Sequence, residues 1–436
     1  MRTIPPVVAA LAECFLAGEQ GVNPVVDRTG RMLGRRWRWL RPLARRFVET
    51  FNGGTRPSRR HVAEFLLADA GFAGARAKYR DEIAVAQWRL EPHPMQPVPA
   101  AQAWEIPAIE SPGALADWLG LKPAELDWFA DLKGLSHNHK LPHVGHYRYR
   151  VTLKRSGGLR LIEAPKPRLK ELQRRILSGI LNQIAPHPAA HGFLKRRSIR
   201  TFVAPHAGQR VVVRMDLQDF FPTFPAARIQ ALFRTLGYPD AVAALLAGIC
   251  TNRAPHEIWK EHAKEVDPAQ RWQARQLYGH PHLPQGAPTS PALANACAYR
   301  LDRRLTGLAE SAGAQYTRYA DDLAFSGGEE FERCVERFAT HVDAILHEEG
   351  FAAHHRKTRI MRQSVRQRLA GLVANQRINV PRRDFDRLKA ILTNCGRFGP
   401  DSQNPKPIHN SAHIWRAAWP SLNRFIQFAA NGFDRC

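Results

Sequence analysis

The spacing of hydrophobic and polar positions divides the chain of 436 residues into four regions. Over residues 1–90 the apolar positions recur at helical spacing, which predicts a helical N-terminal extension. Residues 91–140 open with a stretch rich in Pro and Ala, which is typical of a linker. Two short helices are expected behind it, in SPGALADWLGLKPAELDWFADL, and Ser111 should cap the first of them.

From about residue 141 the pattern changes to a mixture of strands and helices. The segment YRYRVTLKRSGGLRLIEAP predicts two strands around a turn at Gly157 and Gly158, followed by a helix from Leu169 to Ile184. Residues 251–280 are polar and look like an insertion. The residues that follow Asp386 are expected to be helical and basic.

Two further predicted elements carry acidic residues at their ends. The apolar run from Arg210 to Met215 predicts a short strand that ends on Asp216. The segment AQYTRYADDLAFSG predicts a hairpin, and its apolar alternation is interrupted at the tip by Asp321 and Asp322. These acids are therefore candidates for chemistry rather than for the core.

Composition indicates the class of partner. The chain has 64 Lys and Arg against 39 Asp and Glu, a net charge of +25. A field of this sign attracts polyanions, so nucleic acid is the leading candidate. No apolar run has the length of a membrane span, and Glu13 interrupts the run from Val7 to Leu16, which favours an amphipathic helix over a signal peptide. The six cysteines are scattered without a C-x-x-C pair, which favours a reducing cytoplasm over a zinc site or disulfides.

The N-terminal extension concentrates much of the positive charge. From Arg28 to Arg60 there are eleven arginines and a single acid, Glu49. Aromatic residues are interleaved with them, namely Trp37, Trp39, Phe47 and Phe51. Arginine with aromatic neighbours suits RNA through phosphate contacts and stacking, which makes Arg35, Arg36 and Arg38 candidate RNA contacts. The alternative is a solvated helix face whose aromatic residues belong to the core.

Three segments together indicate phosphoryl-transfer chemistry: RMDLQDFFPTF, LPQGAPTSPALANACAYRLDRRL and YADD. Adjacent carboxylates such as Asp321 and Asp322 repel one another, so such a pair requires a cation or a raised pKa. A hard divalent ion is a suitable cation, and Asp216 on a neighbouring strand would complete a two-metal site. Each segment alone is weak, since an Asp-Asp pair in a turn is more often solvated.

In order and spacing these segments resemble the reverse transcriptases, over roughly Arg148 to Arg382. The resemblance implies an α+β right-hand polymerase fold, with fingers and palm interleaved over 141–365, an antiparallel palm sheet, and a primer grip and thumb over 366–436. It implies an RNA-directed DNA polymerase that uses two Mg²⁺ ions and dNTPs. Asp216 and Asp321 would bind both ions, the Leu217 carbonyl would assist, and Asp322 would contribute mainly electrostatically.

The resemblance also implies roles around the nucleotide. Phe221 would be the steric gate against a 2′-OH, with core packing as the alternative. Gln285, beside Gly286, would line the nucleotide and the template base. Arg160 would bind the triphosphate. Arg197 would lie near the template and the nucleotide, with a generic phosphate contact as the alternative. Lys357 would lie near the pyrophosphate, with a solvated lysine as the alternative.

Flanking segments resemble the retron branch: HPAAHGFLKRRSIRTFVAPHAG, LAGLVANQRINVPR and LADWLGLKPAELDWFAD. Of the retron Asn-Ala-x-x-His signature only His206 is present, and of Val-Thr-Gly only Gly371. His206 is either an RNA contact or a buried structural histidine. The resemblance implies a structured non-coding RNA as template and primer and a DNA product. It also implies a role in antiviral defence and allows an effector protein as a further partner.

Two other functions compete with a retron polymerase. The first is an RNA-binding scaffold without catalysis, which the presence of all three aspartates disfavours. The second is an intron-type maturase, which should have a long helical domain after the thumb. Few residues follow Asp386, so that domain is not expected, and neither is an RNase H domain.

Overall fold

The computed structural model describes residues 4–18, 21–51, 57–87, 95–134, 145–154, 158–262, 267–399 and 402. The chain divides into two compact units, and both are discontinuous in sequence. The first unit comprises Met1–Pro186 and Asp219–Tyr299, and the second comprises His187–Gln218 and Arg300–Cys436. The predicted turn residue Gly157 and the predicted helical end of the chain after residue 402 lie outside the described residues.

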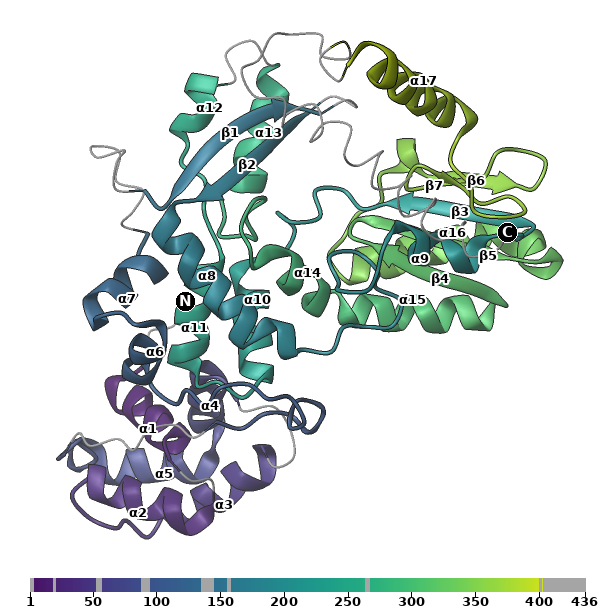
Figure 1. The fold of residues 1–436 in the computed structure, drawn as a ribbon. Helices are drawn as coiled ribbons and strands as arrows, with labels where there is room; N and C mark the ends of the chain where they lie inside the picture. The colour runs from purple at the N-terminus through teal and green to yellow at the C-terminus, as the bar shows by residue number, and fades with distance from the viewer. Residues whose placement is uncertain are drawn as a thin grey trace. The chain divides into compact units, whose positions relative to one another are not determined.

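The N-terminal extension is a helical bundle, as predicted. Its helices are α1 (Pro6–Leu16), α2 (Val22–Met32), α3 (Leu40–Phe51), α4 (Arg59–Ala68) and α5 (Ala70–Tyr79), followed by the short η1 (Arg80–Glu82) (Figure 1). Phe15, Phe47 and Phe72 are among the fully buried side chains of the core that these helices share. The apolar residues at helical spacing thus pack together into one hydrophobic core within the extension.

The remainder of the first unit is mostly helical. Its elements are η2 (Pro99–Ala101), α6 (Pro112–Leu119), α7 (Pro123–Ala130), β1 (Tyr147–Leu153), β2 (Leu159–Pro165), α8 (Pro167–Gly179), η4 (Leu181–Gln183), α10 (Ala226–Thr235), α11 (Asp240–Cys250), α12 (Glu257–His262), α13 (Pro268–Tyr278) and α14 (Ser290–Cys297). The Ser111 hydroxyl accepts a hydrogen bond from the Ala114 N–H, so it caps α6 as predicted.

Strands β1 and β2 form an antiparallel hairpin with two different faces. Leu159, Leu161 and Tyr149 pack on Trp259 and Tyr278 from α12 and α13. The opposite face is exposed and carries Arg148, Arg150 and Arg160. Successive residues of a strand point to opposite faces, so the alternation of Tyr and Arg in YRYRV sets this arrangement. The predicted insertion 251–280 thereby forms two helices that cover one face of the hairpin.

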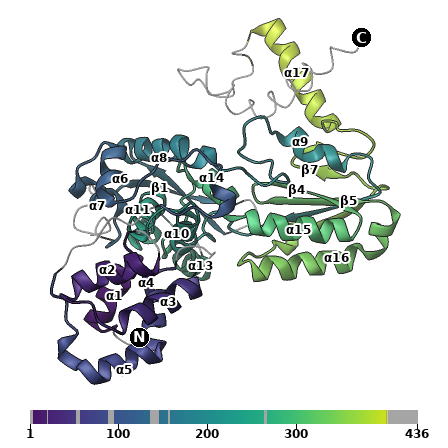
Figure 2. The ribbon, with the colours of Figure 1, turned by 90° about the horizontal axis from the view of Figure 1, so that it is seen from below.

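The second unit is built on an antiparallel sheet. Its elements are α9 (Ile199–Val203), η5 (Ala204–His206), β3 (Val211–Asp216), α15 (Tyr299–Ser311), β4 (Ala314–Tyr319), β5 (Asp322–Gly327), α16 (Glu329–Glu348), η6 (His355–Lys357), β6 (Arg359–Arg362), β7 (Arg368–Leu369), β8 (Leu372–Val373) and α17 (Arg382–Phe398). The sheet order is β4-β5-β3-β6. Figure 2 shows α15 and α16 on one face of this sheet and α9 on the other.

The central strand β3 determines where the sheet places its acids. Val211, Val212 and Val213 are fully buried, because both faces of this strand are covered. Its last residue, Asp216, lies opposite Asp322 of β5 in the register. The predicted α+β class with an antiparallel sheet is therefore confirmed.

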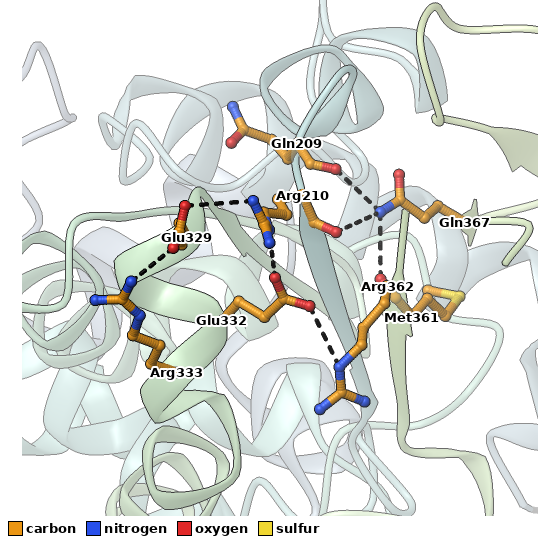
Figure 3. A network of polar contacts seen from close by, with 8 residues as sticks. All are labelled: Gln209, Arg210, Glu329, Glu332, Arg333, Met361, Arg362 and Gln367. Carbon is orange, nitrogen blue, oxygen red and sulfur yellow. Dashed lines mark hydrogen bonds and ion pairs between the residues drawn. The ribbon is translucent and has the colours of Figure 1, made fainter. Parts of the chain in front are cut away.

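The other end of β3 is held by a polar network (Figure 3). Glu332 on α16 accepts from Arg210 at 2.5 Å and lies 3.3 Å from the guanidinium of Arg362 on β6. These exposed pairs contribute little stability individually. The side chain of Gln367 is fully buried, and its amide donates to the Met361 carbonyl at 3.2 Å, which fixes the chain that leads to β7. No helix among the described ranges is long and apolar enough to cross a membrane.

Candidate active site

The β4–β5 hairpin presents its turn at the end of the sheet. Tyr319 pairs with Asp322, which leaves Ala320 and Asp321 as the turn. Ala320 has φ +57°, a left-handed conformation that costs a non-glycine residue about 1 kcal/mol. Arg318 holds this conformation, because its guanidinium donates to the Ala320 carbonyl at 3.2 Å.

The guanidinium of Arg318 is itself fixed within the core. Both Arg318 and Asp302 are fully buried, and they form two hydrogen bonds of 2.7 and 2.6 Å. The Tyr316 hydroxyl donates to the same carboxylate at 2.8 Å. A buried charge is tolerated when it is paired and hydrogen-bonded in this way. Asp302 therefore orients the turn through Arg318.

A second support of the turn is the segment before α9. The Arg318 N–H donates to the Ala189 carbonyl at 2.8 Å, and the His191 N–H donates to the Arg318 carbonyl at 2.7 Å. Gly192 follows and packs against the turn, where a Cβ would lie 2.5 Å from the Ala320 nitrogen. Only glycine fits this position without moving the turn. Sequence reasoning missed Gly192, since its contact lies more than a hundred residues away.

Strand register and turn bring the three predicted aspartates together. Asp216 lies opposite Asp322, and the Leu217 N–H donates to the Asp321 carbonyl at 2.9 Å. Burial, together with the charges of Asp216 and Asp322, raises the pKa of Asp321 to about 6. Burial also raises the pKa of Asp322, although Arg214 opposes this. The site thus concentrates negative charge that is poorly solvated.

Two cations offset this charge. The Lys357 ammonium lies 2.8 Å from Asp216 Oδ2, and the Arg214 guanidinium donates to Asp322 Oδ1 at 2.6 and 2.9 Å. Within the described ranges no three acidic, His or Cys side chains are arranged to hold one metal ion. The donor chemistry nevertheless fits a hard divalent cation. Lys357 offsets the charge of Asp216 in the same way that Arg214 offsets the charge of Asp322.

Arg214 and the backbone around Lys357 were not identified from the sequence. Arg214 stands two residues before Asp216, and residues two apart share a face of a strand. That spacing was the available signal. The His354 N–H donates to the Asp216 carbonyl at 2.7 Å, and the Lys357 N–H donates to the His354 carbonyl at 2.8 Å. The predicted lysine is therefore docked on the end of β3.

The prediction that His206 contacts RNA is wrong. This side chain is fully buried, and its two ring nitrogens lie 2.7 Å from the hydroxyls of Ser326 and Thr317. Thr317 donates its own proton to the Phe202 carbonyl, so Nε2 of His206 must donate to Thr317 and Nδ1 must accept from Ser326. Burial lowers the pKa of His206 to about 3. His206 is therefore a buried structural histidine, the alternative given above. Arg197 is exposed, and its role near the template stays a prediction.

In the first unit, the loop with the predicted Gln285 is tied to strand β2. The Glu163 N–H donates to the Gln285 carbonyl at 2.9 Å. Gly286 has φ +138°, and a Cβ there would lie 2.8 Å from the Glu163 carbonyl oxygen. The buried Glu163 carboxylate contacts His282 at 2.9 Å and Asn252 at 2.7 Å. This network fixes the loop against the hairpin that carries the exposed Arg160.

The loop after β3 carries the predicted Phe221. Phe220 is buried, whereas Phe221 is only half-buried and its ring centroid lies 5.6 Å from that of Phe220. In the same loop Asp219 binds the Lys154 ammonium at 2.5 Å. Lys154 comes from the end of β1, and sequence reasoning missed it. Its cation and that of Arg160 belong to one hairpin, which makes both candidates for binding an anionic ligand.

The aromatic residues of the basic extension do not serve as predicted. Trp37 and Phe47 are buried, and Trp39 and Phe51 pack against the same core. The prediction that Trp37 and Phe47 stack on RNA bases is therefore wrong, because both rings are buried in the core of the helical bundle. Arg28 is also buried, and it donates to carbonyls at the end of α1.

The candidate arginines of this extension are exposed, but two of the three are paired. Arg35 binds Glu82 at 2.8 Å, and Arg36 binds Asp27 at 2.5 Å. Both acids lie outside the segment from Arg28 to Arg60. Counting the acids within that segment therefore overestimates how many of its arginines lack an acidic partner. Arg38 is exposed, with no ion pair to any described acid. Its role in RNA binding stays a prediction.

Comparison with known proteins identifies the family. The family profile described as "Reverse transcriptase (RNA-dependent DNA polymerase)" matches residues 152–374. Retron Mx65 reverse transcriptase of Myxococcus xanthus is 44% identical over 57% of this chain and 56% of its own length. Retron Mx162 reverse transcriptase of the same organism is 37% identical over 74% of this chain and 67% of its own.

A third relative comes from another organism. Retron Ec86 reverse transcriptase of Escherichia coli is 31% identical over 59% of this chain and 73% of its own length. The chain thus spans little more than half of Mx65 and larger shares of the other two. The matched segment runs from the end of β1 through β8 and includes the paired aspartates at the end of the sheet. The chain belongs to the reverse transcriptases, the RNA-dependent DNA polymerases, and within them to the retron type.

Proposed function

We propose that this chain copies a dedicated structured RNA into DNA at the site formed by Asp216 and Asp321. The observation that carries the proposal is the meeting of β3 with the β4–β5 turn, where the pKa of Asp321 is raised to about 6. Poorly solvated carboxylates at such a point favour a cation. The retron relatives support a dedicated RNA as the template.

Reverse transcriptases use divalent metal ions, and we expect two Mg²⁺ ions here. Bound at the site, such ions activate the attacking 3′-oxygen and stabilise the leaving pyrophosphate. Asp216 and Asp321 would bind them, with the Leu217 carbonyl as a further oxygen ligand. Asp322 stays paired with Arg214 and contributes through its charge. The Lys357 ammonium offsets the charge of Asp216 and would be available to a phosphate when metal replaces it.

The first unit supplies candidate groups for the incoming dNTP. The cations of Lys154 and Arg160 suit a triphosphate, with Lys154 resting on Asp219 in the free protein. The half-buried ring of Phe221 suits a sugar-facing role, because a fully packed core ring would leave no face for a ligand. Gln285 is held by its carbonyl, which leaves its side chain for the nucleotide or the template base.

The cognate RNA would serve as template and primer, and the product would be a short DNA within a ribonucleoprotein. The exposed arginines of the helical extension, such as Arg38, would contact RNA phosphates. Antiviral defence is the biological setting that we propose, with an effector protein as a further partner. Its test is to purify the protein from its native operon and sequence the nucleic acid bound to it. A single DNA of defined length joined to one RNA is expected, whereas a mixture of cellular RNAs would contradict the proposal.

The site is tested by Asp321→Asn, with Asp343→Asn on α16 as a matched control. Primer extension with Mg²⁺ should be abolished only in Asp321→Asn, while RNA affinity stays unchanged. The melting temperature gives a second measurement, since Mg²⁺ should raise it in wild type and much less in Asp321→Asn. Primer extension by Asp321→Asn would show that the assignment of this active site is wrong. Wild type that binds RNA but extends no primer would support the non-catalytic scaffold.

A further inference from the structure

Helix α13 carries an aromatic side chain that the core does not use. The indole of Trp272 is 62% exposed, although this helix is firmly packed on its other side. Ala274 and Tyr278 are buried there against Trp259 and the β1–β2 hairpin. The helix is thus well anchored, and Trp272 is presented to solvent from a rigid support. The exposed ring is therefore available for stacking with a ligand.

Trp272 borders a hollow in the surface. The hollow measures about 290 Å³ and is lined by Trp259, Pro268, Arg271, Trp272 and Arg275. Two indoles and two guanidinium groups therefore make up most of its wall. The Nε–H of Arg271 is buried, and the described residues offer it no hydrogen-bond acceptor. A buried donor of this kind favours a ligand that accepts a hydrogen bond.

Both charged side chains that line the hollow are cations. Arg271 and Arg275 are one helical turn apart, a spacing at which like charges repel. Helix α13 contains no acidic residue between Pro268 and Tyr278. Neither arginine forms an ion pair with an acid in the described ranges. The two cations therefore favour an anion with more than one charged group.

We propose that this hollow binds an unpaired segment of RNA, with one base stacked on Trp272 and phosphates on Arg271 and Arg275. Base stacking on aromatic side chains together with cations along the backbone is the usual mode of single-strand binding. A duplex hides the faces of its bases, so it would offer this hollow only phosphates. The inference rests on the proposed function in naming RNA as the partner. It adds a separate site for single-stranded RNA, on the insertion 251–280 of the first unit.

The test measures binding in the Asp321→Asn background, where extension does not consume the RNA. The probes are a short unstructured RNA and an RNA duplex of equal length, each with a fluorescent label. Trp272→Leu keeps an apolar side chain without a ring of the required size, and Trp272→Phe keeps a ring. Trp128→Leu is the matched control, because Trp128 on α7 is also exposed and lies outside the hollow.

Trp272→Leu should weaken single-strand binding at least about fivefold, and Trp272→Phe should recover most of it. Duplex binding and the melting temperature should not change, nor should Trp128→Leu reduce binding. Replacing Arg271 and Arg275 by Gln should lower the slope of log affinity against log salt by about 1.4, the value for two phosphates of a single strand.

Unchanged single-strand binding in Trp272→Leu would overturn the inference and would favour a protein partner for the hollow. An equal loss on duplex and single strand would also overturn it, since stacking could not be the cause. Both results are separable from failure of the proposed function. That failure appears as absent extension by wild type, which binding measurements in the Asp321→Asn background do not involve.

Discussion

A single added methyl group at Gly192 tests how strictly the β4–β5 turn must be placed. In Gly192→Ala the new Cβ would lie 2.5 Å from the Ala320 nitrogen and 3.2 Å from the Tyr319 carbonyl carbon. Ordinary contacts of a Cβ begin near 3.4 Å, so the two backbones must separate by about 0.9 Å. No flexible side chain can absorb this shift, because both partners are backbone.

The displacement should reach Asp321, the neighbour of Ala320 in the turn. The segment before Gly192 is fixed to β4 by two backbone hydrogen bonds with Arg318, so it cannot easily withdraw. A misplacement of about 1 Å at reacting groups costs roughly 100-fold in rate. The added volume should cost about 1–3 kcal/mol of stability, which leaves a typical domain folded.

The assay is single-turnover extension of a pre-annealed primer with Mg²⁺, together with thermal unfolding. Gly307→Ala on α15 is the control, because a Cβ there meets nothing within 4 Å. We expect about 100-fold slower extension in Gly192→Ala and an unchanged rate in Gly307→Ala. Undiminished extension by a folded Gly192→Ala would refute the reasoning. If Gly192→Ala does not fold, Gly192 has a purely structural role and the reasoning about the turn is also refuted.

Three further predictions concern sugar selection, pH and salt. Phe221→Ala should raise incorporation of ribonucleotides relative to deoxyribonucleotides, and an unchanged ratio would leave Phe221 as a packing residue. Because the folded pKa of His206 is about 3, below the usual 6.5, its contribution to stability is present above pH 6.5 and lost as the pH falls. The melting temperature of wild type should therefore drop more steeply below pH 6.5 than that of His206→Gln, and parallel curves would contradict this. Removing residues 1–87 should weaken RNA binding and flatten its salt dependence, with Arg38→Gln alone reducing the slope by about 0.7; an unchanged slope would assign the extension to another ligand.

Local pattern was sufficient to predict the elements that carry the acids. Asp216 ends an apolar run, and Asp321 with Asp322 interrupts a strand-like alternation, so their positions follow from neighbouring residues. Their meeting in space depends on the pairing of β3 with β5, more than a hundred residues apart in sequence. Sequence reasoning obtained that pairing only through resemblance to a family.

Contacts between distant segments account for what was not predicted. Gly192 and Asp302 act on the turn through residues of β4. Lys154 meets Asp219 across 65 residues. The pairing of Arg35 with Glu82 likewise joins the arginine-rich window to an acid beyond it. Periodicity and charge counts describe a segment by its own composition, so they cannot show which partner folding brings to it.

Each of the two retron signature residues that remain in this chain has a structural reason to be there. Gly371 has φ +87° beside Ala370 at φ +45°, in the turn of the β7–β8 hairpin, and two positive φ angles in succession favour Gly at the second position. His206 bridges β4 and β5 through Thr317 and Ser326, so its loss would leave the buried Ser326 hydroxyl without the acceptor of its hydrogen bond. Both residues therefore have roles within the second unit that require no ligand. Departures at the other signature positions leave the contacts of His206 with the β4–β5 hairpin in place. We expect differences in RNA choice to arise from exposed surfaces such as α13 and the basic extension.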